Sequence, residues 1–228
     1  MPDGREDDDI ALLEAWCRGD RSAGNRLFER HYQSVARFFH NKVSEAAQED
    51  LIHDTFVACQ KSVARFRRQS SFRVFLFGIA RNVLAEHLRR MARQKARLEP
   101  ELDLDEVSAA SLGLSQAAIA MRHEEQRLLL EALRNIPLPH QIALELHYWE
   151  ELTAAEIAEV LAIPLGTAKT RLYDGREHLK EQLRRLARSV EALQSTLDDL
   201  DQWARRMRTQ VGSAPAAGGR ERRAGGAR

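Results

Sequence analysis

The clearest structural signal in the chain lies in residues 153–176, which read TAAEIAEVLAIPLGTAKTRLYDGR. Thr153 and Glu156 have the spacing of a capping box, in which a hydroxyl accepts an early backbone N–H and a carboxylate bonds back to the cap residue. This box predicts the start of a short helix, and the turn around Pro164 predicts that a second helix begins near Leu165. Two short helices joined in this way are typical of a helix-turn-helix, whose second helix can enter the major groove of DNA.

The second helix of this pair carries hydroxyl and cationic side chains, which suit phosphate oxygens and base edges. Ala158, on the first helix, is small enough to let the two helices approach closely. A helical hairpin that only packs is the structural alternative, but the capping box, the small residue and the basic second helix together favour DNA binding. The side chains predicted to face DNA are Thr167, Lys169, Thr170, Arg171, Tyr173 and Arg176.

Helical periodicity also covers most of the chain before this motif. Apolar residues recur every three or four positions, and no stretch alternates with the period of two that a half-buried strand needs. Ser22 is the predicted N-cap of the first long helix, and the polar residues 66–71 predict a loop. We therefore expect an all-α fold. The predicted helices cover 22–43, 47–65, 71–92, 117–135 and 139–149.

Two small helical domains are expected, at 22–97 and 117–187. The segment between them, 98–116, is acidic and only weakly periodic, which predicts a flexible linker. Residues 1–21 are expected to form a separate N-terminal segment. Its acidic start, from Asp3 to Asp9, is expected to fray.

A heptad pattern begins at Leu179 and continues to Met207. Its apolar residues alternate spacings of four and three, which predicts a coiled-coil seam or a long helix docked on another surface. We assign 188–210 to a long helical extension beyond the second domain. The Gly-, Ala- and Arg-rich residues 211–228 are expected to form a disordered tail.

The net charge of +1 conceals a strongly segmented chain. Residues 61–97 carry a net charge of +10, whereas residues 1–60 carry −5 and residues 98–152 carry −8. A local field of this strength attracts polyanions, although a solvated arginine-rich helix face is the plainer alternative.

Composition argues against several other classes of protein. No apolar run approaches the roughly 20 residues that a bilayer span needs, and nothing near Met1 has the layout of a signal peptide. Cys17 and Cys59 are too few for a disulfide framework or a four-cysteine zinc site. We therefore expect a cytoplasmic protein with no membrane span, no metal and no cofactor.

Two blocks of sequence resemble, in order, region 2 and region 4 of bacterial RNA polymerase sigma factors. The first contains QEDLIHDTF at 48–56 and FLFGIARN at 75–82, and the second contains IPLPH at 136–140 and PLGTAKTRL at 164–172. With only these two domains and a short linker, the chain is similar to the compact extracytoplasmic-function (ECF) group. The resemblance covers about 22–187.

The resemblance implies a region 2 helical bundle, a region 4 helix-turn-helix and a dissociable subunit of bacterial RNA polymerase. Such a subunit binds core RNA polymerase, recognises the minus-ten and minus-thirty-five promoter elements and promotes DNA melting. The acidic linker would thread through the polymerase near the RNA path, and an anti-sigma factor is a further expected partner.

The resemblance also implies three sets of site residues. The residues that bind polymerase are Asp50, Leu51, Asp54 and Phe56. The residues at the minus-ten element are Phe66, Arg67, Arg68, Ser70, Ser71, Phe72, Arg73, Arg81 and Asn82. The residues at the minus-thirty-five element are Thr167, Lys169, Thr170, Arg171, Tyr173, Asp174 and Arg176.

Binding of a base flipped out of the minus-ten element would explain why residues 61–97 are so basic. Extruding a base costs a few kcal/mol of stacking, which pocket contacts and a basic groove have to offset. Phe66 and Phe72 could stack on the base or wall its pocket, and the Asn82 amide suits a base edge. Core packing is the preferred role of Phe75 and Phe77.

Some positions depart from the family pattern. Phe75 stands where tryptophan is frequent, Asp174 where a basic residue is frequent, and Gly175 where alanine is usual. A carboxylate at Asp174 would repel phosphate, but it could accept a hydrogen bond from the amino group of cytosine. The extension after about Arg188 lies outside the two-domain pattern.

Two other classes of function compete with this one. A stand-alone helix-turn-helix regulator could dimerise through the C-terminal heptads, but it leaves the block at 48–82 unexplained. An enzyme would need an acid–base pair such as His53 with Asp54 or Glu145 with His147. No nucleophile motif, phosphate-binding loop or metal spacing accompanies these pairs, so we do not expect an enzyme.

Residues 179–209 carry a separate hypothesis. One reading is a regulatory helix that pairs with a second copy, with an anti-sigma factor, or with region 2 or region 4 of the same chain. The other reading is a longer last helix of region 4 that packs locally.

Overall fold

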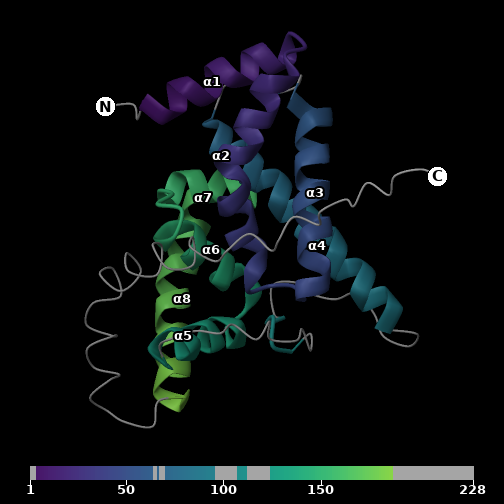
Figure 1. Ribbon diagram of the computed structural model, residues 1–228. Helices are drawn as coiled ribbons and strands as arrows, with labels where there is room; N and C mark the ends of the chain where they lie inside the picture. The colour runs from purple at the N-terminus through teal and green to yellow at the C-terminus, as the bar shows by residue number, and fades with distance from the viewer. Residues whose placement is uncertain (1–3, 64–65, 67–69, 96–106, 112–123, 187–228) are drawn as a thin grey trace, which may run out of the picture.

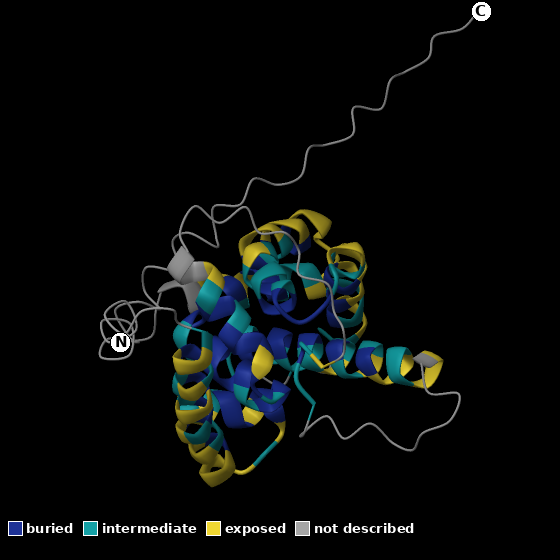
Figure 2. Ribbon diagram, turned by 90° about the horizontal axis from the view of Figure 1, so that it is seen from below, coloured by how far each residue is buried: buried dark blue, intermediate teal, exposed yellow. Residues whose placement is uncertain are grey.

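The computed structural model describes residues 4–63, 66, 70–95, 107–111 and 124–186. Within these residues the chain forms eight α-helices and no strand, which confirms the expected all-α fold. We call α1 to α4 the N-terminal half and α5 to α8 the C-terminal half. The two halves pack against each other (Figure 1), and the buried residues gather where helices face one another (Figure 2).

The N-terminal half is built from four helices: α1 (Gly4–Cys17), α2 (Arg21–His40), α3 (Glu45–Ser62) and α4 (Phe72–Lys95). The N-cap of α2 is Asp20, whose carboxylate accepts hydrogen bonds from the backbone N–H groups of Ser22 and Ala23 at 2.8 and 3.2 Å. The prediction of Ser22 as this cap was wrong, because Ser22 already lies in the first turn. Large buried side chains from all four helices form the core, among them Leu13, Leu27, Phe39, Leu51 and Phe77.

Helix α1 corrects the expectation that the acidic start of the chain frays. It lies across one end of α2 (Figure 1) and is fixed there by Asp9, which is only 3% exposed. The Asp9 carboxylate lies 2.7 Å from His31 Nε2 and accepts a hydrogen bond of 2.7 Å from Arg30 Nη1. Gly24 permits the close approach of the two helices, since a Cβ there would meet the Trp16 ring at 2.6 Å.

The C-terminal half contains α5 (Glu124–Asn135), α6 (Leu138–Tyr148), α7 (Ala154–Leu161) and α8 (Leu165–Leu186). Both hydrogen bonds of the predicted capping box are present at the start of α7, between Thr153 and Glu156. The chain leaves α7 through Ala162, which adopts a left-handed backbone conformation with φ of 53°. This turn aims α8 across α7, and the predicted helix-turn-helix is confirmed.

Residues 107–111, which fall in the segment predicted as a linker, dock on the C-terminal half. The Val107 carbonyl accepts a hydrogen bond of 2.8 Å from the Leu138 N–H, and the Ala110 N–H donates one of 3.0 Å to the Arg134 carbonyl. Ala109 is fully buried. The remainder of 98–116 lies outside the described residues.

The heptad pattern enters the described residues only through the end of α8. Leu179 and Leu183 are buried there, and α8 packs along α5. Within α8, this seam therefore packs locally in the C-terminal half. The predicted extension 188–210 and tail 211–228 lie outside the described residues.

Candidate nucleic-acid interface

Helix α8 divides into a buried face and an exposed face. Ala168, Leu172 and Gly175 are buried, whereas Tyr173 is 64% exposed and Leu165 is 45% exposed. These two are the large exposed hydrophobic side chains of the described part of the chain. Thr167, Lys169 and Thr170 are exposed as well, so most of the side chains predicted to face DNA do lie on the surface.

Close packing holds α8 in position under this face. A Cβ at Gly175 would lie 3.2 Å from Leu144 Cγ and 3.3 Å from His140 Cβ, which is tighter than ordinary van der Waals contact. The glycine that departs from the family pattern therefore lets α8 pack closely on the Leu144 and His140 side chains of α6. A neighbouring bond also ties the helices together, because His140 Nδ1–H donates to the Arg171 carbonyl at 3.2 Å.

Three predicted DNA-facing residues of α8 are half-buried: Arg171, Asp174 and Arg176. Arg176 Nε donates a hydrogen bond of 2.8 Å to the Tyr148 hydroxyl, at the end of α6. Burial lowers the pKa of His140, and the charges of His178 and Arg171 act in the same direction, whereas the Asp174 carboxylate opposes them. The side of α8 next to α6 is thus engaged with the protein itself.

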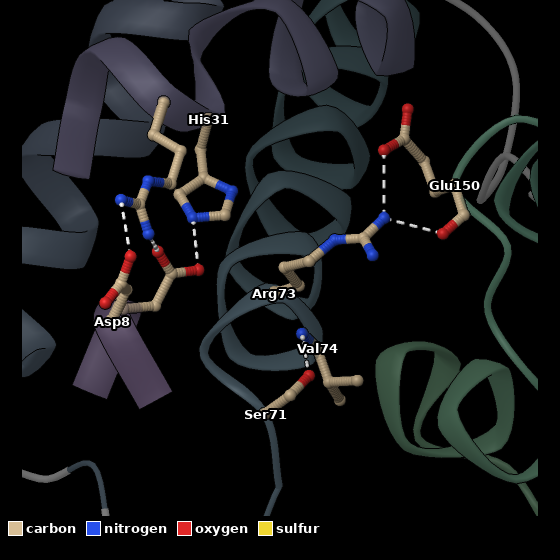
Figure 3. Close-up of polar contacts among 8 residues, drawn as sticks. Asp8, His31, Ser71, Arg73, Val74 and Glu150 are labelled. Atoms are coloured by element: carbon tan, nitrogen blue, oxygen red, sulfur yellow. Dashed lines mark hydrogen bonds and ion pairs between the residues drawn. The ribbon is translucent and has the colours of Figure 1, made fainter. Parts of the chain in front are cut away.

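The predicted loop before α4 places Ser71 at the start of the helix. Ser71 Oγ accepts a hydrogen bond of 3.2 Å from the Val74 N–H and so caps α4 (Figure 3). Ser70 is half-buried beside it. Arg67 and Arg68, which the resemblance assigns to the minus-ten element, lie outside the described residues.

The aromatic residues around this loop have unequal access to a ligand. Phe72 is 2% exposed and its ring centroid lies 5.2 Å from that of His31. In this arrangement its ring is not open to a base, and support of the pocket wall from the core is the part of the prediction that remains. Phe66 is half-buried, with its ring 5.0 Å from that of Phe75. Phe77 is buried in the core and Phe75 packs against it, as predicted for both.

Helix α4 carries the remaining minus-ten candidates. Arg73 Nη2 donates to the backbone carbonyl of Glu150 at 2.6 Å and to its carboxylate at 3.2 Å (Figure 3). Farther along the helix, Arg81 donates a hydrogen bond of 3.0 Å to the amide oxygen of Asn82, which is exposed. Arg81 and Asn82 therefore share a surface, whereas Arg73 is bound to the other half of the molecule.

Helix α3 holds the residues predicted to bind polymerase. Asp50 and Asp54 are exposed, and Phe56 is half-buried with its ring 4.0 Å from that of Phe28. Leu51 is only 5% exposed and belongs to the core. In this arrangement Leu51 holds α3 in place from within the core, and its assignment to the polymerase contact stays a prediction.

Glu145 and His147, one of the acid–base pairs considered for an enzyme, do not contact each other, because each binds a different partner. The Glu145 carboxylate is buried with Lys42 and accepts a hydrogen bond of 2.9 Å from Gln141. His147 Nδ1–H donates instead to the Leu152 carbonyl at 3.0 Å. In the described ranges, no group of three or more His, Cys, Asp or Glu side chains could hold a metal ion, and no helix is long and apolar enough to cross a membrane.

Sequence reasoning missed the charged contacts between the two halves. Lys42 is fully buried and forms an ion pair with Glu145, and Glu150 pairs with both Arg37 and Arg73. The available signal was Glu145, a charged residue within the otherwise apolar stretch 142–146, whereas Lys42 lies among polar residues and gave no such sign. Such a charge is buried only when it is paired.

Comparison with known proteins agrees with this architecture. The family model for sigma-70 region 2 matches residues 27–94, and the model for sigma-70 region 4 matches residues 126–179. The ECF RNA polymerase sigma-E factor of Haemophilus influenzae is 26% identical over 182 residues, which cover 78% of this chain and 96% of the relative. That of Escherichia coli K12 is 27% identical over 188 residues, covering 79% and 96%.

Solved structures show the same fold. CnrH in complex with the cytosolic domain of CnrY matches with a TM-score of 0.55 and 21% identity, over 79% of this chain and 99% of that one. The sigma factor RpoE from Bartonella quintana, in complex with the anti-sigma factor NepR, matches with a TM-score of 0.54 and 19% identity, over 72% and 97%. Since the two family models match in this order and together span more than half of the chain, it belongs to the sigma-70 family, in its ECF group.

Proposed function

We propose that this chain is a dissociable sigma subunit, which binds core RNA polymerase, recognises the minus-ten and minus-thirty-five elements and promotes melting of promoter DNA. Its family assigns it to transcription initiation. The observation that carries the finer proposal is the exposed face of α8, which displays Thr167, Lys169, Thr170 and Tyr173 on a helix fixed by tight packing.

The minus-thirty-five element is read by this face of α8. Hydroxyl and ammonium groups at its start suit phosphate oxygens, and the large exposed ring of Tyr173 suits apolar contact with a thymine methyl group. Neither interaction needs the helix to move, because these side chains already point away from the core.

The minus-ten element is bound by the start of α4 and the loop before it. Arg73, Arg81 and Asn82 supply cationic and amide groups along one helix, and Phe66 supplies an aromatic wall. The net charge of +10 over residues 61–97 would hold the melted strand against this surface. Phe72 supports the site from within the core.

Two further assignments concern the arrangement of the subunit. Residues 22–97 and 117–187 act as region 2 and region 4 domains, with 98–116 between them as the linker that passes near the RNA path. The polymerase contacts the exposed acidic side of α3 around Asp50 and Asp54. Because bacterial RNA polymerase works in the cytoplasm, we place this subunit there.

An anti-sigma factor is the regulatory partner that we propose. The solved sigma factor RpoE, to which this chain is similar in fold, is in complex with the anti-sigma factor NepR. The heptad residues 179–209 remain candidates for this contact, for self-association or for local packing. Deleting residues 189–228 should change oligomeric state, promoter output or regulation if the segment is regulatory.

The test is transcription in vitro from a genomic promoter library, with core RNA polymerase in the presence and absence of the protein. We expect transcripts that start downstream of a shared two-part motif only when the protein is present. Binding of DNA by the protein alone, with no new transcripts, would overturn the proposal in favour of an independent regulator.

The role of Asp174 is tested in the same assay. Asp174 is half-buried beside the exposed face of α8. If its carboxylate reaches the base edges, it prefers a cytosine amino group, so Asp174→Arg should shift the selected minus-thirty-five base toward guanine. Selection of the same base by both proteins would show that position 174 does not read the sequence.

A further inference from the structure

Helices α6 and α8 meet at a contact between a tyrosine and an arginine. Tyr148 is the last residue of α6, and Arg176 lies near the middle of α8. Arg176 Nε donates a hydrogen bond of 2.8 Å to the Tyr148 hydroxyl, and the guanidinium carbon lies 5.6 Å from the centre of the tyrosine ring. Both side chains are half-buried. The tyrosine therefore holds the arginine by one edge, at the border between the packed side and the exposed face of α8.

The other edge of the Arg176 guanidinium is open to a ligand. A guanidinium is a planar group with five N–H donors, one on Nε and four on the two Nη atoms. Among the described residues, the Nη atoms of Arg176 have no hydrogen-bond or ion-pair partner. Arg37, in contrast, forms an ion pair with Glu150. Because its partner in the described part of the chain is a neutral hydroxyl, Arg176 keeps its positive charge for a ligand.

Close packing keeps the tyrosine in place. Gly175, on the buried side of α8, lies so near α6 that a Cβ there would be 3.2 Å from Leu144 Cγ. Tyr148 packs against the core, and its ring meets the His147 ring edge-on, with 4.9 Å between the centroids. The His147 ring is fixed in turn, since its Nδ1–H donates to the Leu152 carbonyl at 3.0 Å. The hydroxyl that binds the arginine is therefore part of a well-packed surface.

Arg176 also belongs to the row of side chains proposed to face DNA. Residues three, four and seven positions apart lie on the same face of a helix, and Lys169, Tyr173 and Arg176 have these spacings. Lys169 and Tyr173 are exposed. Arg176 lies about 16 Å along the helix axis from Leu165, the first residue of α8. Since the first turns of a recognition helix contact the base edges, Arg176 lies beyond them, where the phosphate backbone borders the groove.

We propose that Tyr148 positions Arg176 to bind one phosphate of the DNA at the minus-thirty-five element. With Nε held by the hydroxyl, the guanidinium presents its two Nη atoms, whose parallel N–H donors match two phosphate oxygens. The side chain is fixed before DNA arrives, so it loses less conformational freedom on binding than a mobile side chain would. The inference rests on the proposed function, because it concerns DNA held by the exposed face of α8.

A double-mutant cycle tests the positioning. Tyr148→Phe removes the hydroxyl and keeps the ring, and Arg176→Ala removes the guanidinium. The complex of the full chain with core RNA polymerase is titrated with a fluorescent duplex from a promoter selected in the library, over a series of salt concentrations. Tyr32→Phe, on α2, is the control for loss of a hydroxyl, and Arg184→Ala, near the end of α8, is the control for loss of a cation.

We expect Arg176→Ala to reduce the slope of log affinity against log salt by about one, as loss of one phosphate contact does. Tyr148→Phe should weaken binding by about fivefold, as loss of one hydrogen bond does, and should keep the slope because the cation remains. In the Arg176→Ala background, Tyr148→Phe should have no further effect. Both controls should bind like the wild type. Additive losses from the two variants, or wild-type affinity in Tyr148→Phe, would overturn the proposal.

Chemically altered DNA separates a phosphate contact from a base contact. An uncharged methylphosphonate replaces each phosphate of the duplex in turn, and we expect one position at which the wild type loses affinity and Arg176→Ala does not. Replacement of guanine by 7-deazaguanine, which lacks the N7 acceptor, should affect both proteins equally. A loss on 7-deazaguanine that is absent in Arg176→Ala would show that Arg176 reads a base, and this result would overturn the proposal.

Arg176→Lys guards against an effect on folding alone. Lysine keeps the charge but lacks the planar fork and its Nε–H. The salt slope should therefore stay near that of the wild type, and Tyr148→Phe should lose its effect in the Arg176→Lys background. A fivefold loss from Tyr148→Phe in that background would mean that the hydroxyl acts only on the packing of α6, which would also overturn the proposal. Circular dichroism checks that every variant is folded at the assay temperature.

The proposed function is scored separately, by transcription from the promoter library with the wild-type chain and core polymerase. Transcription by the wild type, together with additive losses in the cycle, rejects the positioning alone. If no promoter is transcribed, the proposed function is rejected, and the cycle is measured with the full chain and a duplex of mixed sequence. Coupling between Tyr148 and Arg176 there would still support the phosphate site, whereas additive losses or an absence of binding would overturn it.

Discussion

At the scale of single residues, burial decides which of the predicted side chains can act on a ligand. Leu51 and Phe72 sit within motif blocks that the family resemblance identifies, yet both lie in the core. Tyr173 is a large aromatic residue that the fold leaves exposed. Residue type and spacing single out these positions, but only packing separates residues that support a surface from those that form it.

Tyr173→Ala should therefore reduce activity without affecting stability. Loss of one base contact costs about 1–3 kcal/mol, so we expect transcription from a promoter with both elements to fall by about tenfold. The free energy of unfolding should change by less than about 0.5 kcal/mol, because the side chain is exposed. Promoter-directed transcription and urea unfolding provide the two measurements, and Tyr173→Phe, which keeps the ring, is the control.

The two cysteines should differ sharply in reactivity. Cys17 is exposed, whereas Cys59 is buried and its pKa is raised to about 12 by burial and by the nearby Cys17. One thiol per native chain should react with a thiol reagent near neutral pH, and both should react after denaturation. Rapid labelling of both thiols in the native chain would contradict the packing around α3.

The same thiol predicts a loss of stability in alkaline solution. Because the unfolded thiol ionises around its ordinary pKa of 9.0 and the folded one only at about 12, its contribution to stability is complete below 9. That contribution is then lost as the pH rises from 9 to 12. Cys59→Ala should remove this part of the slope, which urea unfolding across the pH range can measure.

At the scale of elements, the predictions were best where periodicity and capping act locally. The helix-turn-helix and the long amphipathic helices are specified by side chains close together in sequence, such as Thr153 with Glu156. Helix α1 was missed because its acidic sequence gives little local sign of a stable helix. It is held by distant groups, His31 and Arg30, which only the fold brings to Asp9.

Asp9→Asn tests how α1 is held. Burial raises the pKa of Asp9, but hydrogen bonds and charges from His31 and Arg30 outweigh it, so the net shift is downward from 3.8. The carboxylate therefore stabilises the fold at any pH above 3.8 and loses this effect as the pH falls through its lowered value. Near neutral pH we expect Asp9→Asn to cost about 1–3 kcal/mol.

Thermal unfolding of both proteins at neutral and acidic pH checks this prediction. The difference between wild type and Asp9→Asn should shrink in acid, where the wild-type carboxylate takes up its proton. A difference that stays constant across the acidic range would mean that the charge of Asp9 plays no part in holding α1.

At the scale of the whole molecule, the charge of the chain serves two purposes that its net value conceals. Cations on exposed surfaces of α4 suit DNA, whereas Lys42 and Arg37 bind carboxylates of the other half. The net charge of each sequence segment identified the basic region 61–97, but it could not show which of the cations form ion pairs within the protein. Pairing between residues more than a hundred positions apart depends on how the halves pack.

Added salt should affect the buried ion pairs and the exposed cations of α4 differently. Buried ion pairs are screened much less than exposed ones. Raising sodium chloride should therefore leave energy transfer nearly unchanged between a dye on Cys17, in the N-terminal half, and a dye on a cysteine introduced as Arg184→Cys, in the C-terminal half. Affinity for single-stranded DNA should fall steeply over the same range, because counterions compete for the phosphates. A parallel loss of both signals would contradict the buried placement of Lys42 and Glu145.

The two-faced character of α8 has a practical consequence for reprogramming gene expression. Gly175 and the buried leucines pack α8 against the rest of the C-terminal half, whereas the outward side chains make almost no contacts that stabilise the fold. A library randomised at Thr167, Thr170 and Tyr173 would therefore keep its folded scaffold in nearly every member. If this face reads the minus-thirty-five element as proposed, selection from such a library would yield a set of sigma subunits with different promoter preferences, each directing transcription of its own genes from one common scaffold.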